Sequence, residues 1–117
     1  QQALKAFQEA EAWDGPSIIF AYAPCIAHNI DMSKTQTEQK RAVEAGYWTL
    51  YRYNPNAEKP MKVDSKAPTL DYEEFLDGET RYAALKRTFP ENAETLFKAA
   101  KEDASKKYEK YKTLENN

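Results

Sequence analysis

The sequence predicts an α/β fold in which a small sheet of two to three strands is flanked by helices and followed by a helical C-terminal tail. Apolar residues recur at three- and four-residue steps near the N-terminus and again beyond residue 68, which is the period of an amphipathic helix. Between these regions, residues 17–23 and 47–53 are rich in β-branched and aromatic residues and favour strands. A chain of 117 residues supports one hydrophobic core rather than two ordinary domains.

The first predicted pair of elements is a helix followed by a buried strand. The apolar residues of the helix alternate with charged ones, and Asp14-Gly15-Pro16 ends it; they are Ala3, Leu4, Phe7, Ala10 and Trp13. Residues 17–23 are nearly all apolar, which suits a strand buried on both faces of a parallel sheet. Residues 24–31 would then lie at the carboxyl end of that strand, where open α/β sheets place their ligands. A functional site is therefore expected there.

The middle of the chain predicts a helix and a hairpin. Residues 35–38 read Thr-Gln-Thr-Glu, the form of a capping box, and predict a helix that runs from there to Gly46. Residues 47–53 form a strand in this interpretation, and residues 61–64 pair back against it. We expect the aromatic residues Trp48, Tyr51 and Tyr53 to pack against the core rather than to form a platform of rings.

Beyond Pro68 the apolar pattern is helical to the end of the chain. The last helix should begin near Pro90, because proline is tolerated in a first helical turn. Its predicted buried stripe contains Ala93, Leu96, Phe97, Ala100, Ala104, Tyr108 and Tyr111. Residues 112–117 are polar enough to fray.

Composition excludes several classes of partner. The net charge is -2, with 17 basic and 19 acidic residues interspersed, so no basic stripe remains to bind nucleic acid. The longest apolar run, residues 18–26, is far shorter than the roughly 20 residues that span a bilayer, so no membrane partner is expected. A single cysteine favours a reducing compartment such as the cytoplasm. The absence of a start methionine and of a signal peptide indicates a piece of a longer chain.

Cys25 and His28 are the chain's only cysteine and only histidine, three positions apart. They could form a thiol nucleophile with its base, or half of a metal site. Two ligands are too few for a structural zinc site, and a thiol enzyme also needs an oxyanion donor and an orienting group. From the residues alone, the simplest interpretation of Cys25 is a small buried hydrophobic residue, and that of His28 is a loop residue bonded to backbone.

Three segments resemble a known family: AEAWDGPSII at 10–19, AYAPCIAH at 21–28 and AGYWTLYRYNP at 45–55. The likeness continues through DSKAP at 64–68, EEF at 73–75 and RYAALKR at 81–87. Together these segments resemble the C-terminal end of pyruvate:ferredoxin (flavodoxin) oxidoreductase, in the family's order and over nearly the whole chain.

The resemblance implies that residues 1–68 are the C-terminal part of a thiamine-diphosphate-binding α/β domain and that residues 69–117 are a helical tail packing on it. The parent would be a cytoplasmic homodimer that converts pyruvate and coenzyme A to acetyl-CoA and carbon dioxide. It would use thiamine diphosphate, magnesium and 4Fe-4S clusters, and would pass electrons to ferredoxin or flavodoxin. Cys25 matches the last thiolate ligand of the cluster nearest thiamine diphosphate, whereas Asn29 stands where glycine is frequent.

The resemblance also implies what the isolated chain should lack. The other three thiolates and the thiamine diphosphate motif are absent from it, so we expect no catalytic residue, no bound cofactor and no turnover. Two alternatives remain open at this point. The chain could be a non-catalytic interaction or dimer-contact module of a larger protein, or a free-standing enzyme that uses the Cys25 thiol.

Overall fold

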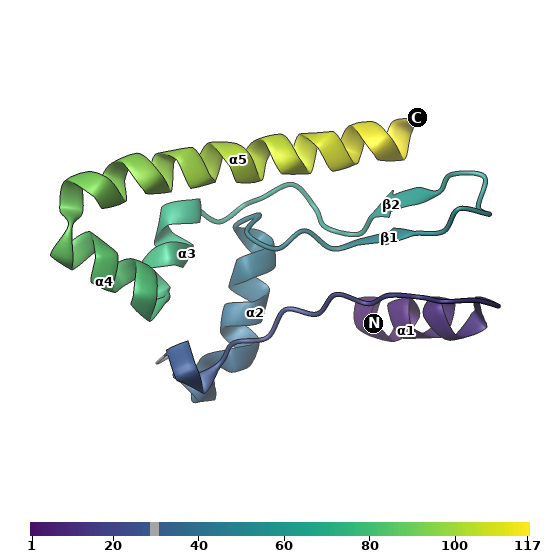
Figure 1. The fold of residues 1–117 in the computed structure, drawn as a ribbon, viewed down its shortest axis with the longest axis horizontal. Coiled ribbons are helices and arrows are strands. Elements are labelled where there is room, and N and C mark those ends of the chain that lie inside the picture. The colour runs from purple at the N-terminus through teal and green to yellow at the C-terminus, as the bar shows by residue number, and fades with distance from the viewer. Residues whose placement is uncertain (29–30) are drawn as a thin grey trace.

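The computed structural model describes residues 1–28 and 31–117 and has an α/β architecture of helices around a small sheet (Figure 1). Among these residues no helix combines the length and the apolar character needed to cross a membrane. In chain order the elements are α1 (Gln2–Ala12), η1 (Ile26–His28), η2 (Met32–Lys34), α2 (Thr35–Glu44), β1 (Tyr51–Tyr53), β2 (Met61–Val63), α3 (Tyr72–Gly78), α4 (Thr80–Thr88) and α5 (Pro90–Asn116).

The sheet is the predicted hairpin, with β1 and β2 antiparallel and Tyr51 opposite Val63. Its first strand is shorter than the predicted residues 47–53, since residues 47–50 are not part of it. The inward side chains of β2 are buried, and β2 packs on α5. The backbone amide of Val63 donates to Glu115 Oε1 at 2.9 Å, which fixes the last turn of α5 to the sheet. The prediction that residues 112–117 fray is therefore wrong, because the helix continues through Asn116.

The core lies where α2, α3 and α5 meet, and Phe75 and Leu76 are its largest fully buried side chains. The carboxylate of Asp71 caps α3 by accepting bonds from the backbone amides of Glu73 and Glu74. The buried cluster is completed by Ala42, Ala45, Tyr72, Ala93 and Phe97. Leu96, predicted to share the α5 stripe, is 55% exposed instead.

The predicted capping box at the start of α2 does not form. Thr35 is already the first helical residue, and its hydroxyl donates to the carbonyl oxygen of Met32 at 2.7 Å. The preceding turn η2 is capped instead by Asp31, whose Oδ1 accepts from the backbone amide of Ser33. Because this turn runs directly into α2, the side chain of Glu38 is not used for capping and is buried.

Residues 17–23 do not form the predicted buried strand of a parallel sheet. The segment is extended, but within the described residues only β1 and β2 pair, so its backbone has no neighbouring strand. Its side chains are correspondingly open to solvent, with Ile18 78% and Phe20 74% exposed. An apolar run becomes a buried strand only where strands flank it and layers cover it, and the described residues provide neither.

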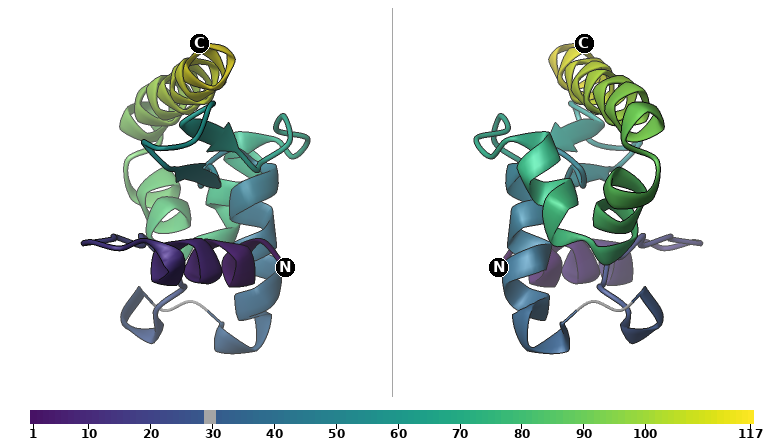
Figure 2. Two further views of the ribbon diagram at one scale, coloured as in Figure 1. Left: turned by 90° about the vertical axis from the view of Figure 1, so that its right-hand side faces the viewer. Right: turned by 90° about the vertical axis from the view of Figure 1, so that its left-hand side faces the viewer.

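The N-terminal quarter of the chain is the least packed. No residue of α1 is buried, and Figure 2 shows α1 and the segment after it set away from α5. The accessible surface is 8744 Å², against roughly 6,500 Å² for a compact monomer of this mass. The radius of gyration is 16.3 Å, against about 13 Å for a compact domain of this length. The structure therefore exposes much more surface than a self-sufficient domain.

Candidate functional site

Cys25 lies where the extended segment ends and η1 begins, so it follows an unpaired segment rather than the predicted buried strand. The preceding Pro24 is buried, whereas the Cys25 thiol is free and exposed. The interpretation of Cys25 as a small buried hydrophobic residue is therefore wrong. The side chain of His28 and all of Asn29 lie outside the described residues, so a pairing of Cys25 with His28 remains a prediction.

Tyr22 anchors the extended segment to the core three residues before Cys25. Its ring lies 5.7 Å from that of Trp48 and 5.9 Å from that of Tyr47, centroid to centroid. Its hydroxyl donates to Glu79 Oε1 at 3.4 Å, and Glu79 is only 9% exposed. This aromatic and polar contact fixes the approach of the chain to Cys25. Trp48 packs here as predicted, whereas Tyr53 is 65% exposed and does not.

Burial raises the pKa of Tyr22 to about 12, and the negative charge and hydrogen bond of Glu79 add to the effect. The neutral phenol is thus favoured in the folded state. An unfolded tyrosine loses its proton near pH 10, so the unfolded state gains stability relative to the folded state between pH 10 and about 12.

We expect Tyr22→Phe to lower the free energy of unfolding by about 1 kcal/mol at pH 8, because Glu79 loses this donor. We also expect the variant to lose less stability than the wild type when the pH rises from 9 to 12, because it lacks the Tyr22 titration. Urea unfolding followed by circular dichroism measures both. Tyr53→Phe, at an exposed position, serves as the control, and equal alkaline losses in wild type and Tyr22→Phe would contradict the assignment.

A second contact holds α1 beside the hairpin. The guanidinium of Arg52 bonds Asp64 twice, through Nε at 2.7 Å and Nη2 at 2.8 Å. Its Nη1 bonds Glu9 of α1, and Gln2 Nε2 donates to Asp64 Oδ2 at 3.1 Å. Polar contacts, rather than apolar burial, therefore position α1.

Among the residues that the structure describes, no group of three or more His, Cys, Asp or Glu side chains is placed to hold a metal ion, at Cys25 or elsewhere. A 4Fe-4S cluster takes four thiolates, and this chain has one cysteine. An exposed thiol at the end of an anchored segment fits the role of a single ligand to such a cluster. The remaining ligands would have to come from outside the chain.

Two buried carboxylates close to this segment escaped the sequence interpretation. Glu38 was assigned to a capping box, and Glu79 was given no role, yet both are among the few buried charged residues. The one available signal was Tyr22, a side chain with a hydroxyl in an otherwise apolar run, since a partly buried hydroxyl needs a hydrogen-bond partner.

No protein-family model matches the chain, but individual proteins do. It is 54% identical over 117 residues to the pyruvate:ferredoxin oxidoreductase of Moorella thermoacetica and 50% identical over 119 residues to the pyruvate-flavodoxin oxidoreductase of Enterobacter agglomerans. A mitochondrial pyruvate dehydrogenase [NADP(+)] of Euglena gracilis is 36% identical over 119 residues. Each alignment covers 97% of this chain, but only 10%, 10% and 7% of the relative. Over nearly its whole length the chain is thus a homologue of one segment, about a tenth, of the pyruvate:ferredoxin and pyruvate-flavodoxin oxidoreductases.

Proposed function

We propose that the chain is the C-terminal piece of an oxidoreductase that converts pyruvate and coenzyme A to acetyl-CoA and carbon dioxide. Residues 1–68 would end its thiamine-diphosphate-binding domain, and residues 69–117 would form a helical tail. The parent would be a cytoplasmic homodimer that passes electrons through 4Fe-4S clusters to ferredoxin or flavodoxin. The isolated chain would hold no cofactor and would be inactive.

The observation that carries this proposal is the concentration of large exposed apolar side chains in the part of the sequence around Cys25. Leu4, Phe7, Ile18, Phe20 and Ile26 are all at least 60% exposed and lie within 23 residues of one another. Single exposed apolar residues are ordinary, but a concentration of large ones marks a surface that another protein surface covers. The remaining domains of the parent would cover these side chains, because they would pack on the extended segment 17–23 and bring the missing thiolates to Cys25.

The names of the relatives indicate which step this segment would serve. One relative is named for ferredoxin, several are named for flavodoxin and one is named for NADP(+), whereas every one of these names contains pyruvate. A segment common to proteins with different named acceptors would serve the shared oxidation of pyruvate rather than the choice of acceptor. A role for Cys25 next to thiamine diphosphate agrees with this, because electrons would pass that point before they reach any acceptor.

In the full-length parent, we expect Cys25→Ser to remove one 4Fe-4S cluster and to lower the turnover of pyruvate at least a hundredfold, because one thiolate in four is lost and electrons must pass through that cluster. Iron and sulfide analysis and electron paramagnetic resonance of the reduced protein measure cluster content. Ala27→Ser, at an exposed position two residues away, is the matched control and should retain every cluster.

The isolated chain gives an independent test of the same assignment. After anaerobic incubation with iron and sulfide and desalting, it should show no stable, stoichiometric 4Fe-4S absorption. A stable cluster on the monomer would contradict the proposal that the other ligands lie elsewhere.

The alternative function, a non-catalytic interaction or dimer-contact module, would also use these exposed apolar side chains. It predicts a different pattern in the parent. Cys25→Ser would leave iron content and activity unchanged, whereas Phe20→Glu would weaken domain or subunit association in analytical ultracentrifugation.

A further inference from the structure

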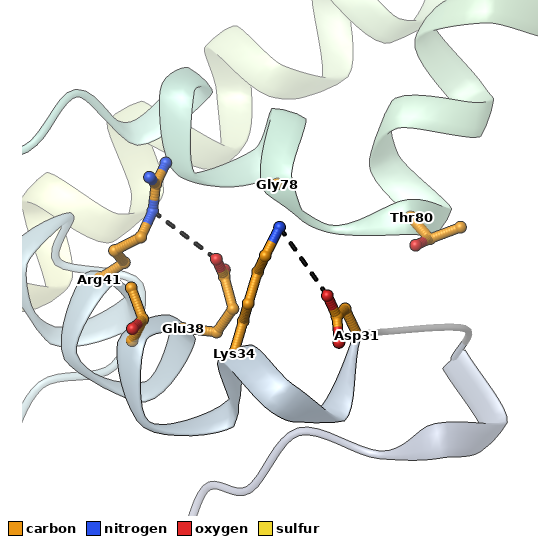
Figure 3. A pocket seen from close by; sticks show the side chains of 7 residues that line it. Asp31, Lys34, Glu38, Arg41, Gly78 and Thr80 are labelled. Atoms are coloured by element: carbon orange, nitrogen blue, oxygen red, sulfur yellow. Dashed lines mark ion pairs between the residues drawn. The ribbon is translucent and has the colours of Figure 1, made fainter.

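The charged pocket beside α2 is neutralised by its own side chains. Figure 3 shows its two ion pairs, Lys34 with Asp31 and Arg41 with Glu38, and in each pair the nitrogen and oxygen are 3.8 Å apart. These charges therefore do not call for a ligand from outside. Open bonding capacity lies instead in the main chain of the extended segment after α1.

The backbone of residues 18–23 has no hydrogen-bond partner among the residues that the structure describes. Because the segment is extended, its amide and carbonyl groups point to its two edges, as they do in a strand without neighbours. Residues 18–21 and Ala23 are exposed, and Tyr22 is half-buried, so the backbone of another molecule has access to the segment. Unpaired strand edges of this kind are templates for pairing with another chain.

Two contacts hold the segment in position for pairing. The hydroxyl of Ser17 donates to the carbonyl oxygen of Ala10 in α1 at 3.2 Å. Toward the other end, the hydroxyl of Tyr22 donates to Glu79 Oε1 at 3.4 Å. The backbone between these contacts is already extended, so pairing costs little additional conformational entropy.

The composition of the segment suits a second copy of this chain as its partner. Residues 17–23 contain no charged residue, no proline and no glycine, which is typical of segments that pair with identical segments. No charged residue lies between Asp14 and Asp31, so two copies meet here without like-charge repulsion. The accessible surface exceeds that of a compact monomer by roughly 2,200 Å². A stable interface covers about 800 Å² of each partner, so the open surface is large enough for one.

We propose that two copies of this chain associate by antiparallel pairing of residues 17–23 about a two-fold axis, with Phe20 of one copy opposite Phe20 of the other. This register places Ile18 of each copy opposite Tyr22 of the other, so large side chains contact one another across the pair. Because both copies use the same segment, the interface closes at two chains. In the proposed parent, other domains would cover this segment. The inference therefore concerns the chain on its own and does not depend on the proposed role of Cys25.

Sedimentation velocity of the wild-type chain over a range of concentrations tests the association. We expect a reversible equilibrium between monomer and dimer, with the dimer fraction rising with concentration. A chain that stays monomeric up to its solubility limit overturns the proposal. Association that passes directly to larger particles also overturns it, because a two-fold pair closes at two chains.

Charged variants test the register. Position 20 faces itself in the proposed pair, so Phe20→Lys and Phe20→Glu should each weaken dimerisation about tenfold or more, because like charges lie directly opposite each other. An equimolar mixture of the two variants should recover dimerisation, because each mixed pair places lysine opposite glutamate. Phe20 is 74% exposed, so both variants should keep the circular dichroism spectrum of the wild type.

Leu96→Lys and Leu96→Glu are the matched controls, since Leu96 is a large apolar residue of α5 that is 55% exposed. Each should dimerise like the wild type. An equal loss of dimerisation in the Leu96 variants would indicate general hydrophobic association and would contradict the proposal. A mixture of the two Phe20 variants that remained monomeric would contradict it as well.

Discussion

Replacing Phe75 with alanine is expected to lower the free energy of unfolding by about 4 kcal/mol, because the truncation removes a phenyl ring from the buried core. The Phe75 side chain has no exposed surface, and its ring centroid lies 4.9 Å from that of Tyr47. It sits where α2, α3 and α5 meet, so truncation leaves a cavity that three helices border. Guanidinium chloride unfolding monitored by circular dichroism measures the loss.

The control for this prediction is Phe89→Ala, which deletes the same side chain at a position that is 57% exposed. Phe89→Ala should lower the free energy of unfolding by less than about 1 kcal/mol, since little of the Phe89 side chain leaves water on folding. If the two variants lost equal stability, the core would not lie where α2, α3 and α5 meet. Because a domain of this size is stabilised by only about 5–15 kcal/mol, the Phe75 variant should unfold at markedly lower denaturant concentration.

The helices and the hairpin were predictable because each depends on short-range pattern. The start of α5 at Pro90 follows from the fixed φ of proline, and the end of α1 follows from the turn residues that include Gly15. The hairpin follows from two β-prone runs separated by a polar loop that includes Pro55. None of these elements requires knowledge of distant contacts.

Burial was less predictable, since it depends on what covers each element. Residues 17–23 carry the composition of a strand buried on both faces, but in this structure they are extended and exposed. The composition of this segment suits a strand with a neighbouring strand on each side and a layer of structure on each face. The described residues provide neither. Glu38 was predicted to be an exposed capping residue, because it stands three positions after Thr35. Its contact with α3, at Gly78, buries it instead.

The exposure of Cys25 could not be predicted from the sequence, and its role as a site residue stays a prediction. The residues alone located the candidate site after the apolar run and identified Cys25 by inventory, yet gave no reason for a lone thiol to be exposed. A cluster ligand set distributed over a long chain leaves no local spacing pattern around any one ligand. The role proposed for Cys25 therefore rests on the family resemblance, and the structure adds that the thiol is accessible.

Replacing Arg52 with methionine is expected to lower the free energy of unfolding by about 2–3 kcal/mol at pH 7 and to release α1 from the hairpin. The Arg52 and Asp64 side chains are only 12% and 13% exposed, so the change leaves a largely buried carboxylate with Gln2 as its remaining partner. Methionine preserves most of the aliphatic packing. Hydrogen exchange of the α1 amides should rise more than that of α5, because the Glu9 contact is also lost.

The pH dependence of this loss identifies its cause. The hydrogen bond from Arg52 holds the pKa of Asp64 below its ordinary value of 3.8, so the pair stabilises the fold above about pH 4 and its contribution disappears as the pH falls through the lowered pKa. The difference in the free energy of unfolding between wild type and Arg52→Met should therefore be largest near pH 7 and should decrease below pH 4. Lys62→Met is the control, since Lys62 lies directly opposite Arg52 on the hairpin and is exposed. That variant should change the free energy of unfolding by less than about 0.5 kcal/mol. If the stability difference between wild type and Arg52→Met did not shrink at all as the pH fell below 4, lost packing rather than the ion pair would be responsible.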